Sequence, residues 1–332
     1  MSYPAVFKNV LLGSSLPQEY LCVNESLSEQ FSVTFSSKNP AQFIDISHRH
    51  TLLGYKPLVI GLVAERSTVE ADWLSAESNG CFSFGNGQFS PTSHWNGLVI
   101  DQRSVARLMM KKLQTLELGD SQVSIWQGEF GENRLLSPIH QMNAKLMVRL
   151  RRQLPGNVAL PGNLYDQVIA AYAVPRAIVI ATVSKGERMN LFPTDLHGPV
   201  GHGNYLDSLR MGGKANDQVE EVGHMALSRM PVSLCKWVYE SGRNHMADWR
   251  SKTNFRLSPV SSRHYGIPLP EGVLSSLELR KTGSLDVGIH RIHTFEIVGE
   301  EDFTGGMGLA HIHRWAAQWR LNHHLETEMF FR

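Results

Sequence analysis

The stretch VPRAIVIATVSKGERMNLFPTDLHGPVGHGN, residues 174–204, decides the fold of this chain. It opens with an apolar run rich in β-branched residues, which is typical of a buried strand. The polar turn SKGER follows, and Gly186 can adopt the positive φ that a tight hairpin needs. The next segment, MNLFPTDL, is extended, and Pro193 favours a sheet edge because proline cannot donate to a ladder. The stretch therefore predicts a hairpin followed by a loop dense in Gly and His.

Length and composition exclude several classes of protein. The chain has 332 residues, 42% of them hydrophobic, which suggests about two domains. The net charge of +1 gives no basic face for nucleic acid. No apolar run is long enough to span a membrane and the N-terminus lacks a signal-peptide pattern, so we expect a cytoplasmic protein without membrane partners. Three cysteines match neither a disulfide framework nor a zinc site, and we expect free thiols at Cys22, Cys81 and Cys235.

The segment PGNVALPGN, residues 155–163, is the best candidate for a domain boundary, because two Pro-Gly-Asn turns stand close together. Residues 1–154 read as an α+β region, and residues 164–332 as a mainly β domain with a C-terminal helix, of the kind that forms a small closed or partly open barrel. The elements on which this rests are strands over 57–65, 177–196 and 274–301 and helices over 101–119, 137–157, 214–230 and 309–330.

The residues themselves suit a phosphate and a flat polar ring. Gly-rich turns expose backbone N–H groups, and a helix start with Lys214 is a ready phosphate site. Asn190, Thr194 and Asp195 add hydrogen-bonding side chains beside Pro193. Equally, Asn190 could cap a turn, Asp217 could cap a helix, and Lys214 could simply be exposed. Spacing alone leaves both interpretations open.

Three segments taken in order resemble the flavin reductase-like family of FMN-binding split barrels. The stretch PRAIVIATV to SKGERMNLFPTDLHGP looks like the opening pattern of that family, in which Asn-x-x-Pro precedes a small hydroxyl residue. RMGGKANDQVEEV resembles the next element, and the segment from HYGIPLPEG to FEIVGEE is similar to the closing strands. The resemblance spans residues 174–301, which is under half of the chain.

The resemblance implies an FMN-binding split β-barrel in the C-terminal part. Together with the α+β pattern of the N-terminal part, this predicts a fold that is mainly β with helices. The resemblance also implies an FMN-dependent oxidoreductase that transfers a hydride from NAD(P)H to flavin, works as a homodimer and has flavin and nicotinamide as small-molecule partners. No catalytic side chain is implied, since the flavin carries the chemistry. The absence of a GxGxxG fingerprint agrees with this family. The implied flavin-binding residues are Thr182, Ser184, Asn190, Leu191, Phe192, Pro193, Thr194, Lys214 and Asn216.

The chain departs from the family pattern at two places. Asp195-Leu196 stands where the family has an aromatic residue, and a carboxylate there would repel a flavin phosphate unless it is turned away. The polar pair Asn216-Asp217 comes one residue late and lacks the usual Thr. These departures keep an alternative open, a non-catalytic flavin-binding split-barrel module. A weaker alternative is a binder of another cofactor, such as heme, that uses the clustered histidines.

Fifteen histidines invite a metal site, but their tight pairs lack further ligands at suitable spacing, so we predict none. His197 and His202 flank the proposed ring site. Either could donate a proton or a hydrogen bond with a pKa near neutrality, or both could be ordinary loop histidines. His290 matches the final-strand His of the family, and we expect it to be structural.

The first half of the chain is either a degenerate copy of the second half or an unrelated accessory region. At one constant offset, four residues match between the halves. They are Pro57, Gly80, Gly85 and Asn86, opposite Pro175, Gly198, Gly203 and Asn204. Because split-barrel flavoproteins dimerise with FMN at the interface, a fused copy would supply the second wall within one chain.

Overall fold

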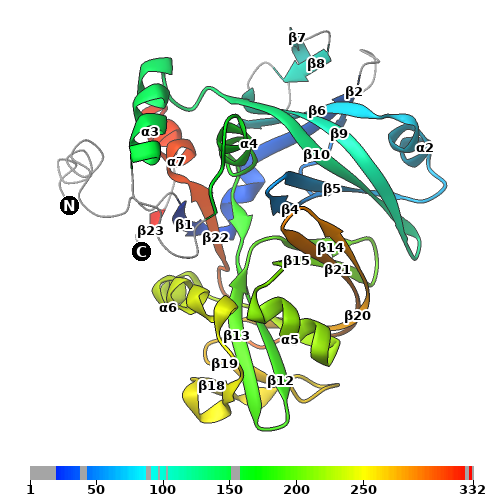
Figure 1. The fold of residues 1–332 in the computed structure, drawn as a ribbon, viewed down its shortest axis with the longest axis vertical. Coiled ribbons are helices and arrows are strands. Elements are labelled where there is room, and N and C mark those ends of the chain that lie inside the picture. Colours follow the sequence, from blue (N-terminus) through cyan, green and yellow to red (C-terminus); the bar gives the residue numbers. More distant parts are fainter. Residues whose placement is uncertain are drawn as a thin grey trace.

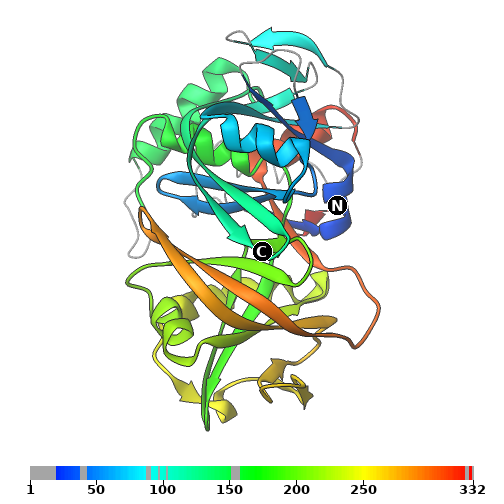
Figure 2. The same ribbon diagram turned by 90° about the vertical axis from the view of Figure 1, so that its right-hand side faces the viewer.

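The computed structural model describes residues 20–37, 43–86, 91–95, 98–101, 104–150, 158–325 and 329–330. Within them the chain is mainly β with several helices, so the predicted fold class is confirmed. Two large antiparallel sheets dominate, one in each half of the chain. They occupy the upper and lower halves of the molecule in Figure 1 and in the turned view of Figure 2.

The first large sheet has seven strands in the order β3-β2-β6-β9-β10-β5-β4. Helix α2 connects β5 to β6 and packs against β5 and β10. We call these elements the first repeat. Their bounds are β2 (Phe31–Ser37), β3 (Phe43–Asp45), β4 (His50–Tyr55), β5 (Leu58–Glu65), α2 (Val69–Ala76), β6 (Asn79–Asn86), β9 (Ser104–Leu118) and β10 (Ser121–Asn133).

The second large sheet repeats this strand order. It reads β13-β12-β16-β20-β21-β15-β14, with the short β17 (Arg250–Ser251) added beside β13. Helix α5 connects β15 to β16 as α2 connects β5 to β6. We call these elements the second repeat. Their bounds are β12 (Val179–Lys185), β13 (Arg188–Thr194), β14 (His197–Val200), β15 (Asn204–Arg210), α5 (Lys214–Val222), β16 (His224–Arg229), β20 (Ser275–Val287) and β21 (His290–Asp302).

The irregularities of the two sheets coincide as well. The pairing of β9 with β10 passes over Leu113 and Glu129, and that of β20 with β21 passes over Thr282 and Val298. The interval along the chain from Leu113 to Thr282 equals the interval from Glu129 to Val298. Because bulges are built features that fix strand register, the two repeats share one plan, and the chain contains an internal duplication of fold.

The duplication aligns the halves differently from the four sequence matches. Pro57 precedes β5, whose counterpart is β15, whereas Pro175 precedes β11 (Arg176–Ala177) and β12. Gly80 lies in β6, and Gly198 lies in β14. The offset taken from the sequence therefore pairs strands that hold unlike positions in the two sheets.

The remaining elements join the repeats and cover them. Helix α4 packs on β9 and β10, and the chain returns to the first repeat at its end, where Trp315 joins the core of that repeat. The other bounds are β1 (Tyr20–Asn24), η1 (Glu25–Gln30), β7 (Pro91–Trp95), β8 (Leu98–Asp101), α3 (Pro138–Leu150), α4 (Leu164–Ala171), η2 (Val232–Leu234), α6 (Cys235–Glu240), η3 (Ser241–Met246), η4 (Lys252–Asn254), β18 (Leu257–Ser261), β19 (Pro268–Pro270), β22 (Leu309–His313), α7 (Arg314–Asn322) and β23 (Met329–Phe330).

The repeats meet along a seam, where the β4–β5 hairpin faces β15 and the turn between β20 and β21. Leu53 and Leu206 belong to one apolar cluster shared by both repeats. The Ser208 hydroxyl donates to the Leu53 carbonyl at 2.6 Å, and the Ile289 N–H donates to the Lys56 carbonyl at 3.1 Å. Figure 2 shows the β20–β21 hairpin in orange reaching the first repeat. The seam is thus a packed interface with its own hydrogen bonds.

The hairpin that opens the second repeat is as the sequence predicts. Gly186 adopts φ +60 in the turn, and Pro193 lies on a strand that β17 pairs only near its other end, at Arg188 and Met189. The strand predicted over 57–65 is β5. The helix predicted over 137–157 is α3 as far as Leu150, while residues 151–157 lie outside the described part of the chain.

The helix predicted over 101–119 was wrong. Residues 104–118 form strand β9, which pairs with β6 on one edge and β10 on the other. Hydrogen bonds to two neighbouring strands outweigh the helical spacing of its apolar residues.

Two further helices are shorter than predicted. The helix over 214–230 ends at Val222 because Gly223 adopts φ +70 and closes it, and β16 follows. The segment 309–330 begins as strand β22 and becomes helical at Arg314.

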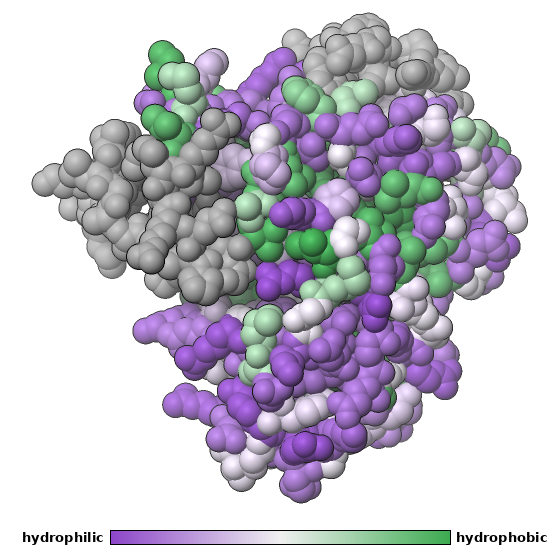
Figure 3. All heavy atoms as spheres, viewed as in Figure 1, coloured by the Kyte–Doolittle hydropathy of each residue, from purple (hydrophilic) through white to green (hydrophobic). Residues whose placement is uncertain are grey.

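Figure 3 shows mainly hydrophilic residues over the second repeat, while apolar residues gather over the first. Among the described residues, no helix combines the length and apolar character needed to cross a membrane.

Candidate functional site

The nine residues predicted to bind flavin lie on β12, β13 and the first turn of α5. Thr182 pairs with Leu191 and Val183 with Asn190, so successive residues of each strand face opposite sides of the sheet. Leu191 joins the apolar cluster on one face, and Phe192 joins the cluster beneath α5 on the other. The structure therefore divides the predicted set between two faces.

Burial divides the set further. Ser184 and Pro193 are half-buried and Lys214 is exposed. The other six are buried: Thr182, Asn190, Leu191, Phe192, Thr194 and Asn216. Side-chain contact between these six residues and a ligand would require the surrounding contacts to open.

Asn190 is committed to the fold. Its Nδ2 donates to Gln218 Oε1 on α5 at 2.8 Å and to the Asn244 carbonyl at 2.9 Å. Asn244 in turn donates its own Nδ2 to the Leu191 carbonyl at 2.7 Å. These buried hydrogen bonds tie β13 to α5 and η3, and removal of any member would leave buried partners unsatisfied.

The start of α5 keeps the features of an anion site. Gly213 precedes it with no side-chain cap, so its first N–H groups and the positive end of the helix dipole are not occupied by a capping side chain. Lys214 Nζ lies 2.9 Å from Asp248 Oδ1, an exposed ion pair that an anion could displace. Asn216 is less available, because its Oδ1 lies 3.1 Å from His293 Nε2.

Asp195 turns toward α4 and β22. Its Oδ2 accepts from the Tyr172 hydroxyl at 2.6 Å and lies 2.9 Å from His311 Nε2. Burial alone would raise the pKa of Asp195, but the hydrogen bonds from His311 and Tyr172 lower it to about 2. The carboxylate at this departure from the family pattern is therefore turned toward two protein donors, Tyr172 and His311, which already satisfy it.

Polar rings and charges from both repeats meet at the seam beside β13. We call Tyr55, Asp195, Arg210, His245 and His290 the seam cluster. The Tyr55 ring stands edge-on to His290 with ring centroids 4.5 Å apart, and the Tyr55 phenol hydrogen-bonds Arg210. Arg210 and His290 are paired across β15 and β21. His245 Nε2 lies 2.7 Å from the Pro193 carbonyl, which joins the cluster to the Asn-x-x-Pro strand.

His290 is the member of the seam cluster that most clearly lacks partners. It is 2% exposed, and neither ring nitrogen has a hydrogen-bond partner. Burial lowers the pKa of His290 to about 4, with Asp195 opposing and Arg210 assisting, so the ring is neutral near pH 7. An orphaned buried polar group costs about 1–3 kcal/mol, which a bound ligand can offset. The seam cluster therefore fits a polar ligand, although the sequence predicts only a structural role for His290.

The first repeat has a cavity of about 500 Å³ at the equivalent place. Ser121 pairs with Glu65 there as His290 pairs with Arg210 in the second repeat. The turn after β14 closes the cavity from across the seam. Its side chains from the first repeat include His48, Arg49, Glu65, Thr68, Glu70 and Ser121. The interface between the repeats thus has two equivalent places. We call the one beside Glu65 and Ser121 the first seam and the one beside Arg210 and His290 the second seam. They are built alike and lined by different charges.

Of the two histidines that flank the proposed ring site, His197 fits the interpretation as an ordinary loop histidine with a local hydrogen bond. Its Nδ1 lies 2.7 Å from the Tyr205 hydroxyl, and burial lowers the pKa of His197 to about 4, below the near-neutral value that a proton donor would need. His202 is exposed in the turn between β14 and β15.

In the part of the chain that is described, no three His, Cys, Asp or Glu side chains are grouped so as to hold a metal ion. Cys22, Cys81 and Cys235 are buried and none of these three forms a disulfide, which agrees with the prediction of thiols in place of a disulfide framework.

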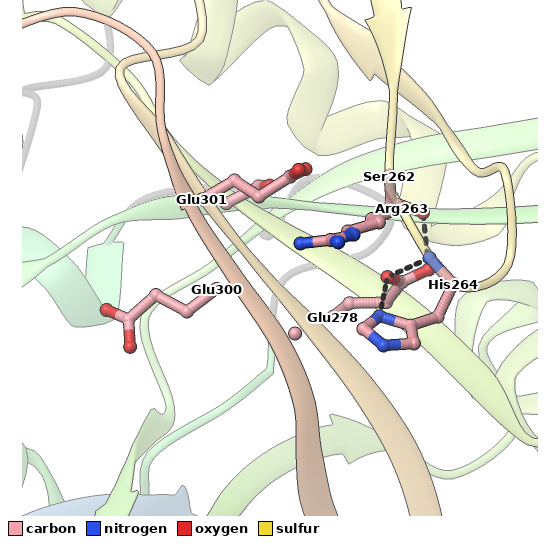
Figure 4. A pocket seen from close by; sticks show the side chains of 8 residues that line it. Ser262, Arg263, His264, Glu278, Glu300 and Glu301 are labelled. Atoms are coloured by element: carbon pink, nitrogen blue, oxygen red, sulfur yellow. Dashed lines mark hydrogen bonds and ion pairs between the residues drawn. The ribbon is translucent and has the colours of Figure 1, made fainter.

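A second, smaller pocket of about 80 Å³ lies beside Glu278 (Figure 4). Glu278 accepts hydrogen bonds from the Ser262 hydroxyl at 2.5 Å and from the backbone N–H groups of His264 and Tyr265 at 2.7 and 2.5 Å. Burial opposes ionisation, yet these donors lower the pKa of Glu278. The Glu278 carboxylate therefore holds the loop of residues 262–265 against β20. Both of its oxygens already accept hydrogen bonds from the protein, so it needs no donor from a ligand.

Sequence reasoning missed Tyr55 and His245 as members of the site. Arg210 opens the segment RMGGKANDQVEEV, four residues before Lys214. A second cation at that spacing from the predicted phosphate site is the one sequence feature that could have indicated it. Tyr55 lies far away in the sequence and reaches the seam only because the two repeats pack together.

No family model matches this chain, and no curated protein matches it. Solved structures are similar over about half of it. An FMN-binding protein from Thermus thermophilus with bound p-hydroxybenzaldehyde is 19% identical over 48% of this chain and 90% of that protein, with a TM-score of 0.39. BorF, the flavin reductase component of a bacterial two-component tryptophan halogenase, is 15% identical over 51% of this chain and 98% of BorF, with a TM-score of 0.40. The NADH:FAD oxidoreductase SgcE6 from Streptomyces globisporus is 17% identical over 47% and 93%, with a TM-score of 0.38. These likenesses concern a flavin reductase-like fold alone.

Proposed function

We propose that this chain is an FMN-dependent oxidoreductase of the flavin reductase type, which takes a hydride from NAD(P)H and holds the flavin at the seam of its second repeat. One observation carries the proposal. The three segments that resemble the family lie on β12–β13, α5 and β20–β21, and they converge on the seam cluster. The seam cluster holds Arg210 and a buried imidazole without partners, and Lys214 follows four residues after Arg210 at the start of α5.

The residues of the chain would divide the work. Arg210, Lys214 and the uncapped first turn of α5 would hold the phosphate, since cations and helix N-termini bind such anions. The half-buried Pro193, whose carbonyl lies 2.7 Å from His245 Nε2 in the seam cluster, would be the predicted residue nearest the ring, whereas Ser184 lies toward the hairpin turn. The six buried residues of the predicted set would act through the strand and helix that they hold in place.

When bound, FMN accepts the hydride and passes electrons on, and the protein supplies orientation and exclusion of water. The nicotinamide would approach the exposed face of the flavin. No side-chain acid or base is required for a direct hydride transfer, which agrees with the lowered pKa of His197 and His290 and thus with their neutral state near pH 7.

The resemblance implies a homodimer and we expect a cytoplasmic location. The internal duplication makes a homodimer unnecessary for pairing two barrels, because two repeats in one chain would provide the arrangement that a dimer of single barrels provides. A second candidate function is a flavin-binding module without catalysis. It is favoured by the burial of six of the nine predicted residues.

The visible spectrum of the purified full chain with added FMN tests the proposal, followed by NADH or NADPH under anaerobic conditions. Bound flavin that bleaches with either nucleotide supports the oxidoreductase. Bound flavin that stays oxidised with both favours the binding module. Protein that retains no flavin after gel filtration contradicts both.

A further inference from the structure

The two seams carry opposite charges at equivalent positions. Arg210 ends β15 and pairs with His290, whereas Glu65 ends β5 and pairs with Ser121. A few residues later, Lys214 opens α5 and an apolar valine opens α2. The second seam therefore has two cations, of which Lys214 is in an exposed ion pair with Asp248, where the first has a carboxylate and an apolar side chain.

The arginine that lines the cavity of the first repeat, Arg49, already has its charge compensated by an ion pair. Arg49 Nη1 lies 2.5 Å from Glu70 Oε1, and Arg49 Nη2 donates to the Asp45 carbonyl at 2.6 Å. The Thr68 hydroxyl caps α2 by accepting from the Ala71 N–H at 3.1 Å. A phosphate entering this cavity would meet two carboxylates, one compensated cation and a capped helix. Such a lining repels an anion.

An aromatic side chain from the opposite repeat distinguishes the second seam. Tyr55 ends β4, reaches across to His290 and hydrogen-bonds Arg210. In the first seam, β14 and the turn after it contribute Pro199 and Gly201, and neither offers an aromatic ring. Among the described residues that line the two places, the combination of a cation with an aromatic ring from the other repeat is thus found in the second seam.

We infer that the duplication has left one seam per chain able to bind a phosphate-bearing ligand, and that Tyr55 of the first repeat forms its far wall. The identity of the ligand as FMN rests on the proposed function. The Tyr55 ring offers a flat aromatic face to the ring of a ligand. The Tyr55 hydroxyl also hydrogen-bonds Arg210 and so positions the cation for the phosphate.

Titration of the full chain with FMN, followed by flavin fluorescence quenching, tests this inference. We expect one FMN per chain. Tyr55→Ala should raise the dissociation constant about five- to tenfold, the size of one aromatic contact. Tyr55→Phe keeps the ring and loses the hydrogen bond to Arg210, so a rise of about two- to fivefold is expected. The matched control is Arg49→Ala, which removes the cation of the first cavity and should leave FMN affinity unchanged.

Circular dichroism of each variant separates loss of fold from loss of affinity, and Tyr55→Phe decides the case if Tyr55→Ala does not fold. Two FMN per chain, or a loss of affinity in Arg49→Ala as large as that in the Tyr55 variants, overturns the inference. Wild-type chain that binds one FMN, with unchanged affinity in both Tyr55 variants, overturns the inference alone. Wild-type chain that binds no FMN overturns the inference together with the proposed function.

Discussion

The carboxylate of Asp195 and the imidazole of His311 lie 2.9 Å apart, although 116 positions separate them in the sequence. Asp195 directly follows β13, and His311 lies on β22, the strand that returns to the first repeat. The Tyr172 hydroxyl completes the contact at 2.6 Å. This pair holds the end of the Asn-x-x-Pro strand against the junction of the repeats, and so fixes one side of the proposed flavin site.

Replacement of Asp195 by Asn should lower the free energy of unfolding by about 1.5–3 kcal/mol, because two donors lose a charged acceptor at a half-buried place. Urea denaturation followed by circular dichroism measures this loss. Asp248→Asn is the control, since Asp248 is an exposed partner of Lys214, and its unfolding midpoint should not change. Equal midpoints for the two variants would contradict the structural role of Asp195.

Asn190→Ala should destabilise the chain by about 1–3 kcal/mol, because Gln218 and the Asn244 carbonyl would lose a buried donor. The same denaturation assay applies. Ser184→Ala on the neighbouring strand is the control, as this hydroxyl is half-buried and should tolerate removal. An Asn190→Ala variant as stable as wild type would show that these hydrogen bonds do not hold the hairpin.

Four histidines whose pKa is lowered in the folded chain should make the fold sensitive to acid. Burial lowers the pKa of His50 and His313 to about 3 and that of His197 and His290 to about 4. In the unfolded chain a histidine titrates near 6.5, so below that pH the unfolded state binds protons that the folded state refuses. Stability should therefore fall steadily between about pH 6.5 and pH 4. Thermal unfolding midpoints that stay level over this interval would contradict the burial of these rings.

Asp207 should act in the opposite direction. Burial raises the pKa of Asp207 to about 7, although the hydrogen bond from Thr194 opposes this. Between about pH 4 and pH 7 the unfolded carboxyl group releases a proton that the folded one keeps, so this residue costs stability as pH rises. Asp207→Asn removes that cost and still accepts from Thr194. The stability of the variant relative to wild type should grow from pH 4 to pH 7 and then level off; a difference independent of pH would refute the assignment.

The sequence allowed the local features of the second repeat to be predicted, because they depend on neighbouring residues. The turn at Gly186 and the edge position of Pro193 follow from backbone chemistry alone. Strand β9 was misassigned because apolar residues such as Val105 and Leu108 also fit a helical face, and only the pairing with β6 and β10 decides between the two. Tertiary hydrogen bonding of this kind is invisible in a window of sequence.

The candidate site was only partly predictable for a similar reason. Residue types such as Lys214 and Thr194 indicated the elements on which the candidate site is proposed, yet the pattern could not show which side chains would be buried in the core, as Asn190 and Phe192 are. Tyr55 belongs to the other repeat, and nothing near it in the sequence indicates a ligand. Its place in the site follows from the packing of two repeats whose common plan is evident in strand order and bulges, not in matching residues.

Electron density for FMN in crystals of the full chain grown with FMN tests the central claim most directly. The account predicts one flavin at the seam of the second repeat, with its phosphate toward Arg210 and the start of α5 and Tyr55 beside the ring. A flavin in the cavity lined by Glu65 and Ser121, or crystals that contain no flavin at saturating concentration, would contradict it.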